Sequence, residues 1–385
     1  MGLPLALVLA EVGHHVVAID TDSERVISIK RGHSPFEEPG VSQLLEVMLK
    51  CGRFSIEGDY HQVPQCEVVV VVVGTDLDQN ERPQRDSVLN VASRLREVAS
   101  PSTTIILRST VTPGTTSLVH EQLGKHVREV VFCPERIAEG HALEELRKIP
   151  QVIGTMDGQA SLKASQLFSS IGIKCHTLTW REAELGKLLL NSWRYLQFAT
   201  ANEFARVCES YDVSYQSLLR VITEDYSRAS GLMKPGLAGG PCLRKDTLQL
   251  LAGLSISYPV LDNVLNSHDV AIHSIVNAAQ TTVHSPKSAV VQLGLTFKPE
   301  SDDLRGSAAL VLARKLSLCF ENFFVVEPHV SDSSEFNLIT LAKAQEIAEV
   351  VVVGTKHRCF VDGQFGVPIV DIGGSRLINS DGRVA

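Results

Sequence analysis

Short apolar runs of strand length alternate with helical segments through the first part of the chain. Residues 67–73 and 103–107 are strand-like runs rich in β-branched residues, and residues 87–98 between them read as a helix. Strands buried on both faces give continuous apolar runs, which are typical of a parallel sheet with helices on both sides. The pattern predicts an α/β domain, with further strands at 15–20, 130–132 and 151–153.

The pattern becomes helical near residue 181 and returns to strands near residue 287. Leu185, Leu189 and Trp193 begin a series spaced by three or four, which predicts one long amphipathic helix reaching about residue 210. Three domains follow from this: an α/β domain over 1–180, a helical domain over 181–280 and a second α/β domain over 281–385. The strands predicted in the last domain are 288–295, 323–326, 349–353 and, as the final strand, 368–371.

The start of the chain reads as the second half of a nucleotide-binding βαβ unit. A short apolar helix ends near Gly13, and the strand that follows ends in a carboxylate, Asp20. In such a unit an acidic residue at this place binds ribose hydroxyls, whereas elsewhere it is only a solvated strand end. The first strand and the Gly-x-Gly turn are missing from this chain, where only the third glycine, Gly2, can be present. Either the start lies further upstream or the phosphate turn is truly absent.

A glycine-rich stretch at 236–246 contains one cysteine, Cys242. Glycines let the backbone approach a ligand closely. If a helix begins at or just after Cys242, its dipole and Lys245 both favour the nucleophilic thiolate. Asp246, one turn further on, can then act as acid, base or orienter. The plainer interpretation is a glycine turn before a helix, with a buried cysteine that serves as a small hydrophobic residue.

Polar clusters follow three of the predicted strands, and the carboxyl ends of parallel strands are where ligands bind. Three in succession predict a site. In the long helix, Lys187 and Asn191 are four residues apart and share a face. A lysine among leucines needs a reason, although a snorkelling side chain is the alternative. The three clusters are Gly74-Thr75, Ser109-Thr110, and Glu135 with Glu139 after Cys133-Pro134.

Composition restricts the class of protein. The net charge of −8 argues against a general nucleic-acid binder. The eight cysteines form no Cys-x-x-Cys and no pairing with histidine at zinc spacing, which argues against a metal site and indicates a reducing compartment. The longest apolar run, 68–73, is too short to span a bilayer, and no signal peptide is evident. We expect a cytoplasmic protein without a metal, membrane or nucleic-acid partner.

Seven motifs then stand in the order of one family. The chain resembles the UDP-glucose/GDP-mannose dehydrogenase family, the nucleotide-sugar 6-dehydrogenases, over essentially its whole length. The resemblance implies two Rossmann-like doubly wound domains joined by a helical middle domain with a long central helix. The motifs are Gly-Leu-Pro-Leu-Ala at 2–6, Ser109-Thr110-Val, Pro134-Glu135-Arg-x-x-Glu139-Gly, Glu184-Leu-x-Lys187-x-x-x-Asn191, Asn202-Glu203, Gly-Gly-Pro-Cys242-Leu-x-Lys245-Asp246, and Phe297-Lys298-Pro-x-x-Asp-Asp-x-Arg305-x-Ser307.

The reaction that this resemblance implies is a four-electron oxidation of a sugar C6 alcohol to a carboxylate, with NAD as the oxidant. Cys242 would attack the intermediate aldehyde to give a thiohemiacetal, then a thioester that water hydrolyses. Lys187 and Asn191 would stabilise the negative oxygen at C6. Glu135 and Asp246 would handle protons and the hydrolytic water. Thr110 would position that water.

The same resemblance implies two sets of binding residues. Separately, the long helix over 181–210 suggests the seam of a homodimer or higher homo-oligomer. The residues expected to contact NAD are Gly2, Asp20, Arg25, Thr75, Thr110, Glu139, Lys245 and Arg305. Those expected to contact the UDP-sugar are Glu135, Lys187, Asn191, Gly231, Leu232, Met233, Lys234, Pro235, Gly239 and Lys298.

The substrate is inferred from analogy with the family alone. The motif around Glu135 resembles the N-acetylhexosamine branch, so we expect UDP-N-acetyl-D-mannosamine or another UDP-N-acetylhexosamine, for polysaccharide biosynthesis. UDP-glucose is the alternative. A catalytically impaired nucleotide-sugar-binding homologue is another, suggested by the missing turn. A cysteine hydrolase would need a histidine base, and none of the thirteen histidines shares a motif with Cys242.

Overall fold

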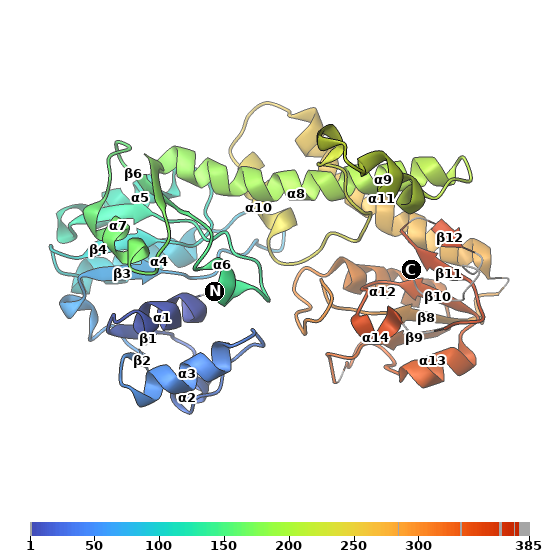
Figure 1. Ribbon diagram of the computed structural model, residues 1–385, viewed down its shortest axis with the longest axis horizontal. Coiled ribbons are helices and arrows are strands. Elements are labelled where there is room, and N and C mark those ends of the chain that lie inside the picture. The colour runs from blue at the N-terminus through green and yellow to red at the C-terminus, as the bar shows by residue number, and fades with distance from the viewer. Residues whose placement is uncertain (1, 284, 332, 362–363, 373, 377–385) are drawn as a thin grey trace. The chain divides into compact units, whose positions relative to one another are not determined.

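The chain divides into two compact units in the structure, a computed structural model that describes residues 2–283, 285–331, 333–361, 364–372 and 374–376 (Figure 1). Unit 1 is Met1–Leu190 with Leu248–Ala252, and unit 2 is Asn191–Thr247 with Gly253–Ala385. Each unit contains sheets of mainly parallel strands with helices between them, so the predicted α/β class is confirmed. The three predicted domains, with boundaries at 180 and 280, stay a prediction.

Unit 1 has two sheets. β1 (Val16–Ile19) pairs in parallel with β2 (Phe54–Glu57). The larger sheet has the order β3-β4-β5-β6-β7, and all its pairs are parallel except β5–β6. Its strands are β3 (Val68–Val71), β4 (Thr104–Leu107), β5 (Glu129–Phe132), β6 (Gln151–Thr155) and β7 (Cys175–Thr179). The helices are α1 (Gly2–Glu11), α2 (Ser23–Lys30), α3 (Val41–Lys50), α4 (Asp86–Val98), α5 (Thr115–Leu123), α6 (Ala142–Glu145) and α7 (Leu162–Ser169).

The larger sheet of unit 1 is covered on both faces. Leu95 of α4 and Leu123 of α5 pack against one face, and Val8 of α1 and Phe168 of α7 pack against the other. Helix α1 also contributes Leu7 to a separate core with α2, α3 and β2. This double covering is the physical reason for the continuous apolar strands in the sequence. The predicted absence of a first strand stays a prediction.

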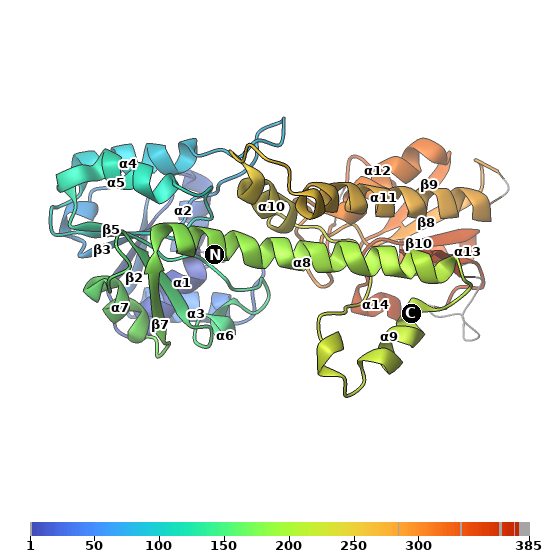
Figure 2. The same ribbon diagram turned by 90° about the horizontal axis from the view of Figure 1, so that it is seen from above.

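One helix of 30 residues, α8 (Trp180–Glu209), confirms the long helix that the spacing predicts (Figure 2). It begins in unit 1 and ends in unit 2, because the units divide between Leu190 and Asn191. Its apolar series is only partly buried: Leu189 is 54% exposed and Trp193 is 53% exposed. Spacing identifies an apolar face of a helix but does not say what covers it.

Unit 2 has one sheet of order β12-β11-β10-β8-β9. The predicted final strand, 368–371, corresponds to β11, and the expectation that it ends the sheet is wrong because the antiparallel β12 follows it. A strand of three residues is too short to give a periodic signal. The strands are β8 (Ala289–Leu293), β9 (Asn322–Val326), β10 (Val350–Val353), β11 (Ile369–Asp371) and β12 (Gly374–Arg376). The helices are α9 (Tyr215–Thr223), α10 (Leu243–Leu251, shared with unit 1), α11 (Pro259–Thr282), α12 (Ala308–Cys319), α13 (Leu341–Ile347) and α14 (Arg358–Val361).

The sheet of unit 2 also has helices on both faces. Ile275 of α11 and Leu312 of α12 pack on one face, and Ala344 of α13 and Phe360 of α14 pack on the other. Strand β8 lies between β9 and β10, so the chain leaves β8 toward one side and later returns to its other side. The loops after β8 and β10 therefore run in opposite directions from neighbouring strand ends. This is the topological switch point, where doubly wound sheets bind ligands.

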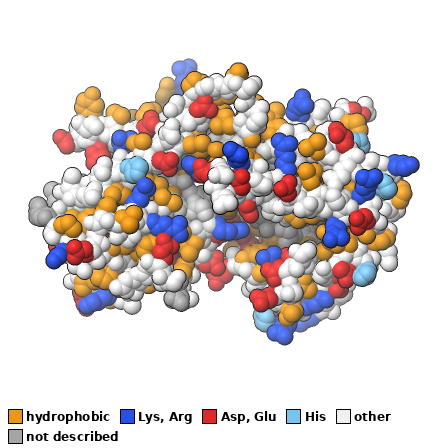
Figure 3. Space-filling view, turned by 180° about the vertical axis from the view of Figure 1, so that it is seen from behind, with side chains coloured by type: hydrophobic (Ala, Val, Ile, Leu, Met, Phe, Trp, Pro, Cys, Tyr) orange, Lys and Arg blue, Asp and Glu red, His pale blue; other side chains and the backbone are white. Residues whose placement is uncertain are grey.

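The described part of the chain contains no helix that is both long enough and apolar enough to cross a bilayer. On the face of the molecule shown in Figure 3, basic and acidic side chains are interspersed with apolar ones.

Candidate functional site

Cys242 stands at the N-terminal end of a helix. Helix α10 begins at Leu243, and the N–H of Asp246 donates its bond to Cys242 O at 2.8 Å. The cysteine is exposed, so the alternative of a buried structural cysteine is wrong. At this position the positive end of the helix dipole favours a thiolate over a thiol.

Asp246 is completely buried in the first turn of α10 and has two polar partners from the expected site. Nδ2 of Asn191, on α8, donates to Oδ2 at 2.6 Å, and Nζ of Lys245 lies 3.5 Å from Oδ1. A buried carboxylate is tolerated only with such partners. The structure thus brings Asn191, Lys245 and Asp246 together within unit 2.

The glycine loop before Cys242 packs directly against the backbone that precedes α12. The N–H of Gly240 donates to Gly306 O at 2.8 Å. A Cβ atom on Gly239 would lie 2.8 Å from the amide nitrogen of Ala308, and one on Gly240 would lie 2.6 Å from the Phe297 ring. Gly240 also has a φ of +95°, where side chains are strained. These contacts explain why the loop needs glycine.

Asn202 fixes the beginning of the same loop. Its Oδ1 accepts from the N–H of Gly236 at 2.9 Å, and its Nδ2 donates to Gly236 O at 3.1 Å. The side chain is buried on α8. The side-chain amide of Asn202 thus binds both the N–H and the C=O of Gly236. The loop cannot rotate at Gly236 without losing these two hydrogen bonds.

A pocket of about 320 Å³ lies at the switch point of unit 2. The loops after β8 and β10 line it, together with the segment before the cysteine loop. Ala309, in the first turn of α12, also lines the pocket, which therefore opens at the N-terminus of a helix. Lys234, Lys298 and Lys356 supply positive charge, and only Asp371 among the lining residues is acidic.

Three of the residues expected to contact the sugar nucleotide, Lys234, Pro235 and Lys298, line this pocket. Leu232 and Met233 instead pack against the core that contains Tyr215. Gly231 is exposed, and Gly239 lies against the backbone before α12.

Sequence reasoning missed the Gly354-Thr355 corner, although the sequence contains a signal for it. Val-Val-Val-Gly-Thr occurs twice, at 71–75 and at 351–355. Both threonines are buried, Thr75 after β3 and Thr355 after β10, and the second lines the pocket. The repeat places equivalent corners at the carboxyl ends of two sheets.

A buried pair of side chains binds the loop after β8, which lines the pocket. Nε2 of His357 lies 3.3 Å from Oε2 of Glu327, which also accepts from the N–H of Leu295 at 2.7 Å. The N–H of Glu300 donates to Nδ1 of His357 at 3.1 Å, so the ring is fixed with its proton on Nε2. Burial alone would raise the pKa of Glu327, but these bonds lower it below its usual value.

In unit 1, two of the three strand-end clusters are in contact. Oγ1 of Thr75 donates to Thr110 O at 2.6 Å, which joins the loops after β3 and β4. Nε2 of Gln249, on α10, donates to Thr75 O at 3.3 Å. No local sequence motif predicts this contact of Gln249.

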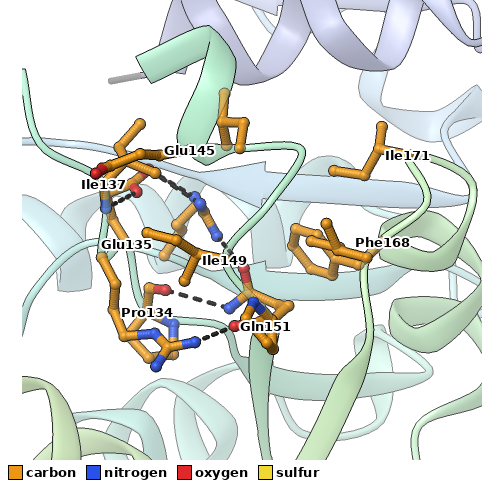
Figure 4. Close-up of a pocket in the computed structure, with 13 residues that line it drawn as sticks. Pro134, Glu135, Ile137, Glu145, Ile149, Gln151, Phe168 and Ile171 are labelled. Carbon is orange, nitrogen blue, oxygen red and sulfur yellow. Dashed lines mark hydrogen bonds and ion pairs between the residues drawn. The ribbon is translucent and has the colours of Figure 1, made fainter. Parts of the chain in front are cut away.

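Glu135 lies in the loop after β5 and is nearly buried, at 8% exposure. Oε1 accepts from the N–H of Ile137 at 2.9 Å (Figure 4). Oε2 is in an ion pair with Arg108. Glu139 and Lys187 are half-buried in the same unit. The expected catalytic residues therefore belong to two units: Thr110, Glu135 and Lys187 to unit 1, and the others to unit 2.

Two arginines expected to contact NAD each pair with an aspartate. Nη1 of Arg25 donates to Oδ2 of Asp20 at 2.8 Å, and this bond and charge raise the pKa of the guanidinium. Arg305, in unit 2, bonds Asp303 through Nε and Nη2, at 3.0 and 2.6 Å. Burial opposes ionisation of Asp303, yet the bonds to Arg305 lower its pKa.

Models of three domains from one family match the chain. The NAD binding domain of the UDP-glucose/GDP-mannose dehydrogenase family matches residues 1–172, its central domain 181–269 and its UDP binding domain 291–369. The chain belongs to this family. It is an NAD-dependent nucleotide-sugar dehydrogenase, an oxidoreductase.

Relatives of this dehydrogenase include enzymes with different sugar substrates. A UDP-glucose 6-dehydrogenase of Bacillus subtilis is 25% identical over 92% of this chain and 83% of its own length. A UDP-N-acetyl-D-mannosamine dehydrogenase of Campylobacter jejuni is 26% identical over 94% of this chain and 95% of its own. A UDP-glucose dehydrogenase structure from Pyrobaculum islandicum, 24% identical, matches the fold with a TM-score of 0.87 over 100% of this chain and 92% of that one.

The dehydrogenase's unit 1 fits NAD. Asp20 follows β1 directly, with 28% of its side chain exposed, so its carboxylate can accept from ribose hydroxyls. Thr75 and Thr110 close the carboxyl ends of the neighbouring strands β3 and β4. Gly2, the first residue of α1, lies close to Val72. A Cβ atom added to Gly2 would lie 3.5 Å from the Val72 side chain.

Proposed function

We propose that the enzyme oxidises the C6 alcohol of a UDP-N-acetylhexosamine to the uronic acid through a covalent intermediate on Cys242. The observation that carries this proposal is the arrangement at α10. An exposed cysteine precedes the helix, a buried carboxylate lies one turn further on, and Asn191 and Lys245 hold that carboxylate. A nucleophile, an orienting carboxylate and an amide donor are the groups that aldehyde oxidation through sulfur needs.

The pocket of unit 2 is proposed to hold the nucleoside diphosphate. Its three lysines and the N-terminus of α12 supply positive charge and N–H donors, which are what a diphosphate requires. The glycine loop runs from this pocket to Cys242 and is held at Gly236 and Gly240. A sugar attached to the diphosphate would follow the same path toward the cysteine.

Cys242 is proposed to form a covalent bond to C6 and later to leave as a thiolate. Its thiolate adds to the C6 aldehyde, which forms a C–S bond and, once the oxygen takes a proton, a thiohemiacetal. Oxidation of this carbon gives a thioester. Water then adds, the C–S bond breaks, the thiolate leaves, and the uronic acid is released. NAD, when bound in unit 1, would supply the oxidant: two NAD molecules in succession would each accept one hydride.

The remaining residues are proposed to move protons and stabilise charge. Nδ2 of Asn191 has two hydrogens, so it can hold Asp246 and also donate to the oxygen at C6. Lys187 would stabilise the same oxygen, and Thr110 would position the hydrolytic water. Asp246 and Glu135 would handle protons in the two halves of the reaction.

Among sugars, UDP-N-acetyl-D-mannosamine is proposed first and UDP-glucose second. The motif around Glu135 and the relative from Campylobacter jejuni support the first choice. The relative from Bacillus subtilis supports the second. The uronic acid product would supply polysaccharide biosynthesis, and we propose the cytoplasm as the location.

The test is a panel of nucleotide sugars incubated with NAD and purified protein, with the products identified by mass spectrometry. UDP-N-acetyl-D-mannosamine, UDP-N-acetyl-D-glucosamine, UDP-glucose and GDP-mannose form the panel. The proposal predicts a uronic acid from a UDP-N-acetylhexosamine at the highest kcat/KM. A uronic acid from UDP-glucose alone would establish the second choice. Binding of UDP-sugars without any product would show a nucleotide-sugar-binding homologue instead of an enzyme.

A further inference from the structure

Arg108 is a buried arginine that none of the proposed steps uses. It follows β4 directly, and its side chain is 2% exposed beneath the loop after β5. Nε donates to Oε2 of Glu135 at 3.1 Å, and Nη2 forms an ion pair with the same oxygen at 3.0 Å. A cation taken out of water is expensive, and its partner is a residue of the proposed active site.

The other side of the guanidinium clamps the same loop. Nη1 donates to Cys133 O at 3.1 Å and to Oε1 of Gln151 at 2.9 Å. Gln151 in turn donates from Nε2 to Pro134 O at 3.2 Å (Figure 4). The Phe168 ring lies 5.6 Å from the guanidinium carbon. Arg108 and Gln151 therefore hold residues 133–135 in place, because their planar groups allow little rotation.

Each oxygen of Glu135 has a partner in the structure. Oε2 faces Arg108, and Oε1 accepts from the N–H of Ile137 at 2.9 Å. The adjoining void has a volume of about 10 Å³, which is room for roughly one water molecule and not for a substituent. A free carboxyl group rotates and alternates between acid and base, whereas this one has a single orientation.

We propose that Arg108 is the positioning residue of Glu135: its buried guanidinium holds the carboxyl group of Glu135 in one orientation, in which the group serves as an acceptor of hydrogen bonds. The inference rests on the proposed function, in which Glu135 is one of two proton-handling carboxylates. It divides their work, because Glu135 then holds the hydrolytic water as an acceptor, through the lone pair of Oε1 that the N–H of Ile137 does not use.

The test compares Arg108→Lys with wild-type enzyme in the presence and absence of Glu135→Gln. Lysine keeps the positive charge, but its one ammonium group cannot donate to Glu135, Cys133 and Gln151 at the same time. We expect kcat to fall about 10- to 100-fold while the KM for NAD stays within about twofold. In the Glu135→Gln background, Arg108→Lys should change kcat less than about twofold, because the group it positions has been altered. Arg147→Lys, on the surface of the same unit, is the matched control.

Three outcomes are distinguishable. If wild-type protein forms no NADH with any nucleotide sugar, the proposed function fails, and this inference fails with it. If wild type is active and Arg108→Lys retains its kcat, or loses the same factor with and without Glu135→Gln, only this inference is overturned. If Arg108→Lys does not fold, Gln151→Met replaces it. That change leaves Arg108 in place and removes one of the two bonds of Nη1, together with the bonds from Gln151 to Pro134 O and Val152 O. An unchanged kcat in Gln151→Met would overturn the inference equally.

Discussion

Asn202 and Gln197 show at the scale of single residues how α8 holds the loop that carries the cysteine. Asn202 is buried and makes two bonds to Gly236, whereas Gln197 is on the surface and donates one bond, at 3.1 Å, to Gly231 O. A hydrogen bond lost in a buried place leaves the backbone group unsatisfied, while one lost at the surface is replaced by water.

Replacing Asn202 by alanine is expected to lower the free energy of unfolding by about 1–3 kcal/mol and to raise the KM for the nucleotide sugar. Gln197→Ala should change stability by less than about 0.5 kcal/mol. Urea unfolding and initial-rate kinetics on both variants measure the difference. Equal effects of the two substitutions would contradict the account of the loop.

Residues with local signals could be found from the sequence, and those that act across the fold could not. Cys242, Lys245 and Asp246 lie within one helical turn, so spacing alone predicts their association. Arg108 reaches Gln151 across 43 positions of the chain, and no motif of the sequence joins them. Such contacts depend on which strands become neighbours, which periodicity does not specify.

At the scale of elements, α8 stabilises the start of another helix. Gly114 precedes α5 without a side-chain cap, and the free N–H groups there need acceptors. Glu184, buried on α8, supplies them: Oε2 accepts from the N–H of Gly114 at 2.6 Å and Oε1 from that of Thr116 at 2.8 Å. A negative charge at a helix N-terminus is favourable in itself.

Glu184→Gln should therefore lower the free energy of unfolding by about 1–3 kcal/mol, because it removes the charge and turns an amide N–H toward backbone N–H groups. The matched control is Glu182→Gln, at the exposed start of the same helix. The N–H and hydroxyl of Thr179 lower the pKa of Glu182, but water can replace that carboxylate. A loss in Glu182→Gln as large as in Glu184→Gln would contradict this interpretation of burial.

The half-exposed apolar side chains of α8 suggest the surface on which two copies meet. Leu189 and Trp193 lie one turn apart on the helix and are each more than half exposed. We predict a homodimer that Trp193→Glu converts to monomers, since a charge would be buried in the contact. Light scattering at micromolar concentration measures the mass. A monomeric wild type would contradict the predicted seam.

Elements with strong patterns were predictable, and short ones with mixed composition were not. The continuous valine runs predict β3 and β10. β7 reads Cys-His-Thr-Leu-Thr, which has neither an apolar run nor a clear face, so its place beside β6 had no sequence signal. The separation of β1–β2 from the larger sheet likewise depends on long-range pairing.

At the scale of the whole molecule, stability should depend on pH through His268. This histidine of α11 is stacked on Tyr195 with ring centroids 3.9 Å apart, and its Nε2 lies 3.1 Å from Tyr195 O. Burial lowers its pKa to about 4 from an ordinary value near 6.5. The unfolded chain therefore binds more protons between these two pH values, so this part of the stability is complete above about pH 6.5 and is lost as the pH falls toward 4.

The expected loss from this one residue is at most about 3 kcal/mol. Urea unfolding followed by circular dichroism near pH 7 and near pH 5 measures it. His268→Gln should reduce the difference between the two conditions, and His176→Gln, at the exposed position of β7, should leave it unchanged. If His268→Gln keeps the full difference, other groups are responsible for the acid sensitivity.

The central claim is that one cysteine carries a two-step oxidation, and the most direct test is the number of NADH molecules formed per nucleotide sugar consumed. Wild-type protein should form two, and Cys359→Ala, which removes another exposed cysteine of unit 2, should do the same. Cys242→Ala should form no uronic acid and no second NADH, because no thioester can arise. Two NADH per sugar from Cys242→Ala, or one from wild type with an aldehyde as the product, would contradict the account.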